Sequence, residues 1–195
     1  MANSEMPQAR SSAKRRRLSA AAAQVLHQRG VERTTIADIA RAADVPVGNV
    51  YYYFKTKDDL VHAALAEQAQ TLAELTAVLE ETADPIDRLH GLIDAWISQR
   101  EIAARYGCPT GSLATEIDKR DEGDLDAEAG RVMRLLLDWC EKQFTAAQVP
   151  DPAGHALTLV SAYQGMSLMA NALREPEVMT REGTRLHAWL ESLRP

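Results

Sequence analysis

The stretch TTIADIARAADVPVGNVYYYFKTKDDL, residues 34–60, decides the fold of the N-terminal part of the chain. Apolar residues recur in it at helical spacing, which predicts a short helix that begins after Thr35. Thr35 and Asp38 have the spacing of a capping box, in which each side chain bonds the other residue's backbone. Asp44 stands where the chain must turn, and Asp tolerates the left-handed backbone of a tight turn. We therefore expect a short helix followed by a sharp change of direction.

A second short helix should follow this turn. Pro46 suits its first turn, where a backbone N–H has no helical partner and its absence costs nothing. Val50 and Phe54 are four residues apart and should share a buried face. Thr56 and Asp59 repeat the capping spacing and should open a third helix. Two short helices at a tight turn are typical of a helix-turn-helix motif that enters the major groove of DNA, and an ordinary helical corner is the alternative.

The composition is that of an ordinary globular chain. Of the 195 residues, 46% are hydrophobic and 26% are charged, which suits one compact domain or two small ones. Apolar periodicity is helical almost everywhere, so we predict an all-α fold. No apolar stretch approaches the length of a membrane span, and no signal-peptide core follows the first basic residues. The two cysteines, Cys108 and Cys140, are too few for a disulfide framework, which favours the reducing cytoplasm.

Charge is distributed unevenly along the chain. Twenty-two Lys and Arg against 28 Asp and Glu give a net charge of −6. Residues 1–60 hold ten basic and six acidic residues, a balance of +4, and the remainder holds twelve and 22, a balance of −10. A basic head on an acidic body can bind phosphates locally, while the body disfavours unspecific adhesion.

Helical periodicity and helix breakers divide the chain into nine expected helices. We expect a disordered tail at residues 1–13, a helix-turn-helix head at residues 14–56 and a helical body at residues 57–195. The Asp-Pro pairs at residues 84–85 and 151–152 should each cap and begin a helix. The nine helices should cover roughly residues 14–29, 36–43, 46–54, 57–81, 85–106, 113–117, 125–147, 152–174 and 178–193.

The run Lys14-Arg15-Arg16-Arg17 begins the first expected helix. Such a run is usually a solvated helix end. Beside a helix-turn-helix it could equally contact phosphates or approach the minor groove. Both interpretations stay open on the sequence alone.

The head resembles the N-terminal domain of TetR-type (TetR/AcrR) transcriptional repressors. The resemblance covers roughly residues 14–62 and rests on TTI at 34–36, IA at 39–40, Val45, GNVYYYF at 48–54 and KDDL at 57–60. The segment GCPTGSLATEI, residues 107–117, is similar to one found in a subgroup of these repressors. The family implies a nine-helix architecture with a three-helix head and a body that binds a ligand and dimerises.

The resemblance implies a homodimer, a palindromic double-stranded DNA operator and a small-molecule effector. It implies that the residues at 47–49 face bases. Most of the other expected DNA-contacting residues should contact phosphates. The residues expected to contact DNA are Lys14, Arg15, Arg16, Arg17, Thr35, Val47, Gly48, Asn49, Tyr51, Tyr52, Tyr53 and Lys57. Val47 is apolar where relatives often carry a polar residue and cannot make a bidentate base contact. Tyr53 replaces a residue that is often His, which puts its contact in doubt.

The body carries apolar, aromatic and sulfur-containing side chains that could line an effector pocket. A simple core is the alternative for each of them. As a group they favour a largely apolar or aromatic effector. The residues expected to line the pocket are Trp96, Tyr106, Cys108, Leu113, Met133, Leu137, Trp139, Tyr163 and Met166.

The last two long helices mix small and apolar residues and could form a four-helix bundle with a second copy. Packing within one chain is the alternative, and the resemblance favours the interface. The residues expected at this dimer interface are Leu159, Tyr163, Ser167, Ala170, Leu186, Trp189 and Leu190.

We find no pattern for catalysis or cofactor binding. The five histidines are scattered, the acidic loop at residues 118–124 lacks calcium-loop spacing, and no nucleophile elbow or phosphate loop occurs. Cys108 could be a thiol sensor at a helix start, although a buried thiol is commoner. We therefore expect no enzyme, metal or cofactor but a cytoplasmic repressor released by its effector. The alternative is a helical small-molecule-binding protein or enzyme with a vestigial head.

Overall fold

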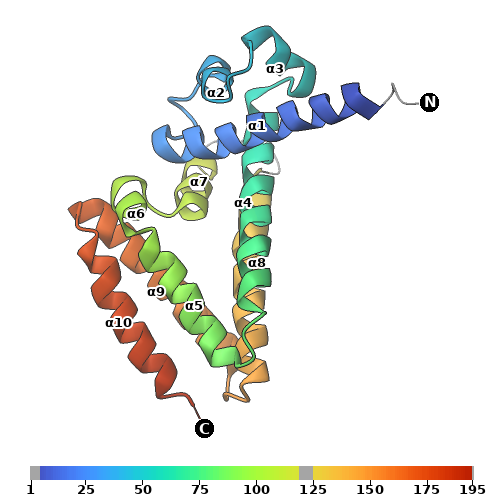
Figure 1. Cartoon of the computed structure of the whole chain (residues 1–195). Helices are drawn as coiled ribbons and strands as arrows, with labels where there is room; N and C mark the ends of the chain where they lie inside the picture. Colours follow the sequence, from blue (N-terminus) through green and yellow to red (C-terminus); the bar gives the residue numbers. More distant parts are fainter. Residues whose placement is uncertain (1–4, 119–124, 195) are drawn as a thin grey trace. The chain divides into compact units, whose positions relative to one another are not determined.

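The computed structural model describes residues 5–118 and 125–194, and in these ranges every regular element is an α-helix (Figure 1). The acidic loop noted above lies almost entirely outside them. The helices are α1 (Glu5–Arg29), α2 (Ile36–Ala42), α3 (Val47–Tyr53), α4 (Lys57–Leu79), α5 (Pro85–Ser98), α6 (Arg100–Tyr106), α7 (Pro109–Ile117), α8 (Leu125–Ala146), α9 (Pro152–Leu173) and α10 (Glu177–Glu191).

The predicted all-α, nine-helix architecture is confirmed, with one helix interrupted. The stretch expected as a single helix over 85–106 breaks at Gln99, whose backbone (φ −94°, ψ 10°) ends α5 and begins α6. The described residues therefore form ten helical segments. No Gly or Pro lies at this break. Because the apolar periodicity continues across it, the sequence predicted a single helix.

Helix α1 begins earlier than expected. It starts at Glu5 rather than Lys14, so the expectation of disorder was wrong for residues 5–13, and residues 1–4 lie outside the described part. Gln8, Ala9, Arg10 and Ala13 of this segment favour helix although they form no apolar stripe. Pro7 falls in the first turn, where proline is tolerated.

The chain divides into two compact units. The N-terminal unit comprises Met1–Gln68 with Leu113–Ala129, and the C-terminal unit comprises Ala69–Ser112 with Gly130–Pro195. The expected boundary at Lys57 differs because the first turns of α4 belong with the head. They bury Leu60, Val61, Ala64 and Leu65.

The N-terminal unit has its own apolar core. The stripe of α1 is buried as expected, and α2 and α3 add short buried faces. Buried side chains include Leu18, Ala22, Val25, Leu26, Ile39, Ala40, Val45, Val50, Phe54, Leu60 and Leu65. The segment that returns from the body also contributes, because Glu116 of α7 accepts the backbone N–H of Val31 at 2.5 Å.

The C-terminal unit holds the larger core, built from α5, α6, α8, α9 and α10. Its fully buried members include Leu89, Leu92, Ile93, Cys140, Phe144, Leu159, Met179 and Leu190. The predicted caps are present: Asp84 accepts the backbone N–H groups of Ile86 and Asp87 at 2.7 and 3.1 Å, and Asp151 accepts that of Gly154 at 3.2 Å. None of the helices in the described ranges has both the length and the apolar character needed to span a membrane.

Candidate nucleic-acid interface

The start of α2 is fixed by the predicted capping box. The backbone N–H of Asp38 donates to Thr35 Oγ1 at 3.2 Å, and that of Thr35 donates to Asp38 Oδ2 at 3.1 Å. The hydroxyl of Thr35 also donates to the carboxylate at 2.6 Å. These Thr35 hydrogen bonds lower the pKa of Asp38, because they stabilise its charged form.

The turn between α2 and α3 depends on two residues. Asp44 adopts the expected left-handed backbone, with φ of 50°. Arg17 of α1 donates through Nη2 to the carbonyl oxygens of Ala43 at 2.5 Å and of Asp44 at 3.0 Å, and to the Asp44 carboxylate at 3.1 Å. Arg17 was expected to contact DNA, but the structure uses its guanidinium to hold this turn.

Helix α3 separates a buried face from an uncovered one. Val50 is fully buried, whereas Tyr52 is 75% exposed, Tyr51 48% and Val47 42%. Gly48 and Asn49 are also exposed, and a Cβ added at Gly48 would meet no atom within 4 Å. The seven-residue helix therefore presents its first turn and two tyrosine rings to the surroundings, as a recognition helix must.

A second capping box fixes the start of α4. Asp59 accepts the backbone N–H groups of Lys55 at 2.7 Å and Thr56 at 3.1 Å, and Thr56 Oγ1 accepts that of Asp59 at 3.1 Å. The backbone hydrogen bond from Lys55 is the main cause of a lowered pKa at Asp59. Lys55 Nζ donates to the Tyr51 carbonyl at 2.7 Å and so stabilises the C-terminal end of α3. This arrangement places Lys57 in the first turn of α4, directly after α3.

Two further residues expected to contact DNA are partly used inside the unit. The Arg15 guanidinium lies over the Phe54 ring at 5.7 Å from its centroid. Tyr53 is half-buried, accepts a hydrogen bond from Ser11 at 3.4 Å and meets Tyr52 edge to face at 5.0 Å. Both line a cavity of about 430 Å³ beside the start of α4.

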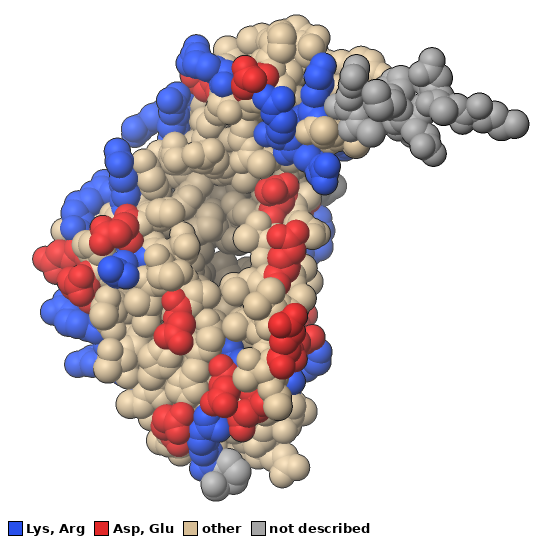
Figure 2. Space-filling model, viewed as in Figure 1, with Lys and Arg blue, Asp and Glu red and all other residues tan. Residues whose placement is uncertain are grey.

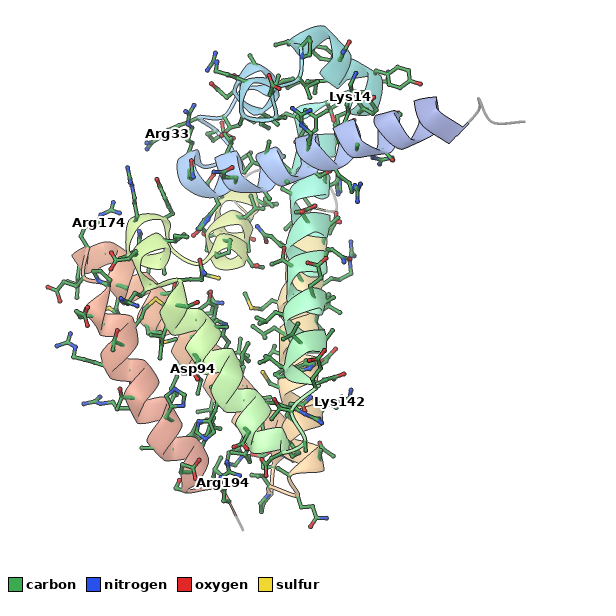
Figure 3. All side chains as sticks on the ribbon, in the orientation of Figure 1. Lys14, Arg33, Asp94, Lys142, Arg174 and Arg194 are labelled. Carbon is green, nitrogen blue, oxygen red and sulfur yellow. The ribbon has the colours of Figure 1, made fainter. Side chains whose placement is uncertain are left out.

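Basic side chains gather over α1–α3 (Figure 2). Lys14 and Arg16 are exposed on α1. Arg33, which the sequence argument passed over, is exposed in the loop before α2 (Figure 3). Its position next to Thr34 and Thr35, at the start of the motif, was the signal that could have identified it.

In the C-terminal unit, several residues expected to line an effector pocket contact one another or a shared neighbour. The Trp96 and Tyr163 rings stack with centroids 4.3 Å apart and planes 14° apart. Gln164 donates to Cys108 Sγ at 3.5 Å and to Met133 Sδ at 3.7 Å. Two other residues expected to line the pocket belong to the core. Met166 is buried in it, and Leu137 packs against it.

Three expected pocket residues are placed differently. Leu113 is buried and belongs to the N-terminal unit. The Trp139 indole N–H donates to Glu80 at 3.2 Å, and the Tyr106 ring lies under the Arg105 guanidinium at 5.2 Å. Amphipathic spacing did not reveal these partners.

Cys108 accepts hydrogen bonds from two parts of the unit. Besides Gln164, the backbone N–H of Gly111 in the first turn of α7 donates to its sulfur at 3.4 Å. Burial, followed by the charge and hydrogen bond of Cys108, raises the pKa of Tyr163 well above its usual value. Cys140 is a core thiol as predicted, and burial raises its pKa to about 12.

The expected dimer residues are mostly core residues. Leu159, Ser167, Ala170 and Leu190 are completely buried within one chain, and Leu186 is 7% exposed. Tyr163 stacks on Trp96, and Trp189 stacks on His155. The assignment was therefore wrong for the buried five, because apolar spacing along α9 and α10 does not show whether a face packs within the chain or against a second copy. The uncovered apolar residues of α9 are Leu157, Leu168, Met169 and Leu173.

Sequence reasoning also missed the polar contacts that join α9 to the end of α6. Asn171 Nδ2 donates to the Ala104 carbonyl at 3.2 Å. Arg174 Nη1 donates to the Ala104 and Arg105 carbonyls at 3.3 and 2.7 Å. Cationic and amide donors at a helix C-terminus satisfy carbonyls that have no helical partner.

Comparisons with known proteins agree with this geometry. Residues 18–64 match the model of the bacterial regulatory proteins of the tetR family. The HTH-type transcriptional regulator TtgR of Pseudomonas putida is 30% identical over 159 residues, which is 81% of this chain and 65% of that protein. An uncharacterized HTH-type transcriptional regulator of Mycobacterium tuberculosis is 26% identical over 83% of this chain and 86% of its own length.

The fold is shared as well. A TetR transcriptional regulator of Chloroflexus aurantiacus superposes with a TM-score of 0.79 at 23% identity, over 93% of this chain and 96% of that one. Residues 18–64 match the family's model, and the relatives are similar along most of the chain. These two findings and the shared fold have the same explanation. The chain belongs to the TetR family of DNA-binding transcriptional regulators.

Proposed function

We propose that this regulator is a homodimeric repressor that binds a palindromic operator and is released by a small, largely apolar or aromatic effector. The observation that carries the proposal is the uncovered face of α3, where Tyr51 and Tyr52 are exposed beside an open first turn. Tyrosine hydroxyls and Asn49 can hydrogen-bond to phosphates and base edges. Val47 can meet a thymine methyl group but cannot read a base through hydrogen bonds.

In this proposal the two recognition helices enter successive major grooves. Exposed Lys14 and Arg16 and half-buried Lys57 attract phosphates, and Arg33 adds a further exposed cation near α2. Base reading rests on few polar groups, so the shape and deformability of the operator carry part of the specificity.

A second copy would cover the apolar residues that α9 leaves exposed. Leu168 is 67% exposed and Leu157 is 58% exposed. Covering these leucines would remove apolar surface from water, which favours association. Small exposed residues on the neighbouring helix, such as Ala188 of α10, would allow a close helix–helix approach. The support for a dimer comes from these exposed residues. The buried residues first expected at the interface are packed within their own chain.

The effector would bind near Trp96, Cys108 and Tyr163 in the C-terminal unit. The stacked rings offer apolar surface, and Gln164 offers a polar group that can fix orientation. Release of DNA requires the effector to bind the released conformation more tightly than the DNA-bound one, because equal affinity shifts no equilibrium.

A mobility-shift titration with the DNA upstream of the regulator's own gene tests the proposal. We expect a shift for the wild-type dimer, and Lys57→Ala should weaken binding to all sequences and reduce the salt slope by about one unit at most. Glu101→Ala, an exposed change on α6, is the matched control. A folded dimer that shifts no DNA at low salt would instead support the small-molecule-binding alternative.

A further inference from the structure

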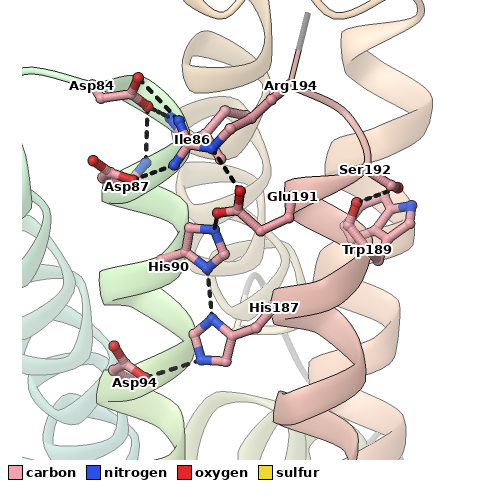
Figure 4. Close-up of polar contacts among 10 residues, drawn as sticks. All are labelled: Asp84, Ile86, Asp87, His90, Asp94, His187, Trp189, Glu191, Ser192 and Arg194. Carbon is pink, nitrogen blue, oxygen red and sulfur yellow. Dashed lines mark hydrogen bonds and ion pairs between the residues drawn. The ribbon is translucent and has the colours of Figure 1, made fainter.

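Two histidines from distant parts of the chain meet between α5 and α10 (Figure 4). The rings of His90 and His187 meet edge to edge and are nearly coplanar, with centroids 4.9 Å apart and planes 12° apart. Their Nδ1 atoms are 2.6 Å apart, which is hydrogen-bond distance. The side chains are only 18% and 28% exposed. Neither histidine takes part in the site described above.

The outer nitrogen of each ring faces a carboxylate. His90 Nε2 lies 2.7 Å from Glu191 Oε1, and His187 Nε2 lies 3.0 Å from Asp94 Oδ1. An ionised carboxylate can only accept hydrogen bonds. Both Nε2 atoms must therefore carry a hydrogen in this arrangement.

This requirement fixes the number of protons at the inner contact. With a hydrogen on each Nε2, neutral rings would direct two Nδ1 lone pairs at each other across 2.6 Å, which is repulsive. With both Nδ1 atoms protonated, two N–H groups and two cations would face each other. One hydrogen between the Nδ1 atoms gives an attractive N–H···N bond. The contact thus needs three hydrogens on four ring nitrogens.

We propose that His90 and His187 form a proton-sharing clasp that joins α5 to α10 in a limited pH window. Loss of the shared proton opens the clasp on the alkaline side, and gain of a second proton opens it on the acid side. Histidine is the side chain that ordinarily changes charge between about pH 5 and 8, so both limits fall near the physiological range.

Neighbouring charges keep Glu191, the acceptor of His90, ionised across that window. Arg194 binds Glu191 at 3.0 Å, Asp84 at 3.1 Å and also Asp87. The hydrogen bond from Arg194, followed by that from His90, lowers the pKa of Glu191. The backbone hydrogen bond from Asp87 is the main cause of a lowered pKa at Asp84.

A third histidine, from α9, also contacts α10. His155 stacks on Trp189 with centroids 5.7 Å apart. The clasp therefore has two flanking carboxylates, Asp94 and Glu191, and a cation, Arg194, behind one of them.

Nitrogen-15 NMR of the full-length protein, with histidine side chains labelled, tests the clasp directly. In the wild type we expect the pair to titrate in two separated steps, with both Nε2 atoms protonated between them, because the two sites are coupled. In His187→Gln, His90 should titrate in a single step. His27→Gln, on α1, is the control that should leave the two steps unchanged. Two wild-type imidazoles that titrate independently, as in the single variants, would overturn the proposal.

Thermal unfolding gives a second measurement. The loss in Tm caused by His187→Gln should be largest near neutral pH and shrink both below about pH 5 and above about pH 8. A loss that stays constant from pH 5 to 9 contradicts the shared proton. The clasp belongs to one chain and does not depend on DNA binding. Any effect on the dimer rests on the proposed function and is read separately by sedimentation equilibrium.

Discussion

Helices α3 and α9 each turn one face into a core and leave another uncovered, but they expose different chemistry. The seven residues of α3 bury one side chain, Val50, and expose tyrosines and a first turn open to approach. The 22 residues of α9 bury six side chains and expose Leu157, Leu168 and Leu173. Rings that carry hydroxyl groups suit the hydrated, charged surface of DNA, whereas bare leucines suit another protein surface. In the proposed function, the uncovered face of each helix would therefore meet a partner of a different class.

The largest effect should come from removing the buried side of the head. Phe54→Ala should lower the free energy of unfolding by about 3–5 kcal/mol, because it empties a core position at the end of α3. Tyr52→Ala should change that free energy by less than about 0.5 kcal/mol while weakening DNA binding. Urea unfolding and a mobility-shift titration separate the two effects. If Phe54→Ala and Tyr52→Ala lowered the free energy of unfolding equally, α3 would not have one face for the core and one for DNA.

The same comparison can be made on α9. Leu159→Ala should lower the free energy of unfolding by about 2–5 kcal/mol, since its side chain is fully buried. Leu168→Glu should leave the unfolding of the isolated chain nearly unchanged but favour monomers, because it puts a charge on the uncovered face. Sedimentation equilibrium at several concentrations measures the second effect. If Leu168→Glu stays dimeric, the partner surface lies elsewhere.

A smaller effect distinguishes two neighbouring arginines of α1. Arg17→Ala should lower the free energy of unfolding by about 1 kcal/mol, because it removes the hydrogen bonds that hold the Asp44 turn. Arg16→Ala should instead leave stability nearly unchanged and reduce the salt slope of DNA binding. Thermal unfolding of the free protein measures the effect on stability. The slope of DNA affinity against salt concentration measures the effect on phosphate contacts. The opposite pattern would show that Arg17 faces phosphates in the complex.

The smallest effect concerns the caps of α2 and α4. The pKa of Asp38 and that of Asp59 are lowered in the folded chain, so each stabilises the fold when the pH lies above the ordinary Asp value of about 3.9. This stabilisation disappears as the pH falls through the lowered folded-state values. The loss in Tm caused by Asp38→Asn should therefore shrink on acidification below about pH 4. Melting curves between pH 7 and pH 2.5 measure it, and a loss independent of pH would exclude an ionic cap.

The head could be predicted in detail because local chemistry determines it. The Thr35–Asp38 and Thr56–Asp59 boxes and the left-handed Asp44 depend on residues within four positions of each other, and all three occur as expected. An unexpected contact there is that of Arg17, which bonds a turn 26 and 27 residues away. Spacing along the sequence contains no information about such a contact.

The body was predictable only as a set of helices. Apolar residues lie on several faces of α9, so periodicity did not show whether Leu159 or Leu168 is covered by the same chain. The contact between His90 and His187 joins residues 97 positions apart, and their wide separation made them look unrelated. The break between α5 and α6 at Gln99 contains no Gly or Pro that could have predicted it. In each case tertiary packing, rather than local preference, decides the outcome.

The open space at Gly48 has a consequence for evolution. Because a Cβ there would touch no atom of the chain and the residues on either side are exposed, the first turn of α3 can change without repacking the unit. The capping boxes and the buried Val50 hold the backbone independently of these positions. Duplicated copies of such a gene could therefore diverge in the sequence they select while inheriting the same scaffold, and a library randomised at 47–49 should fold almost without exception.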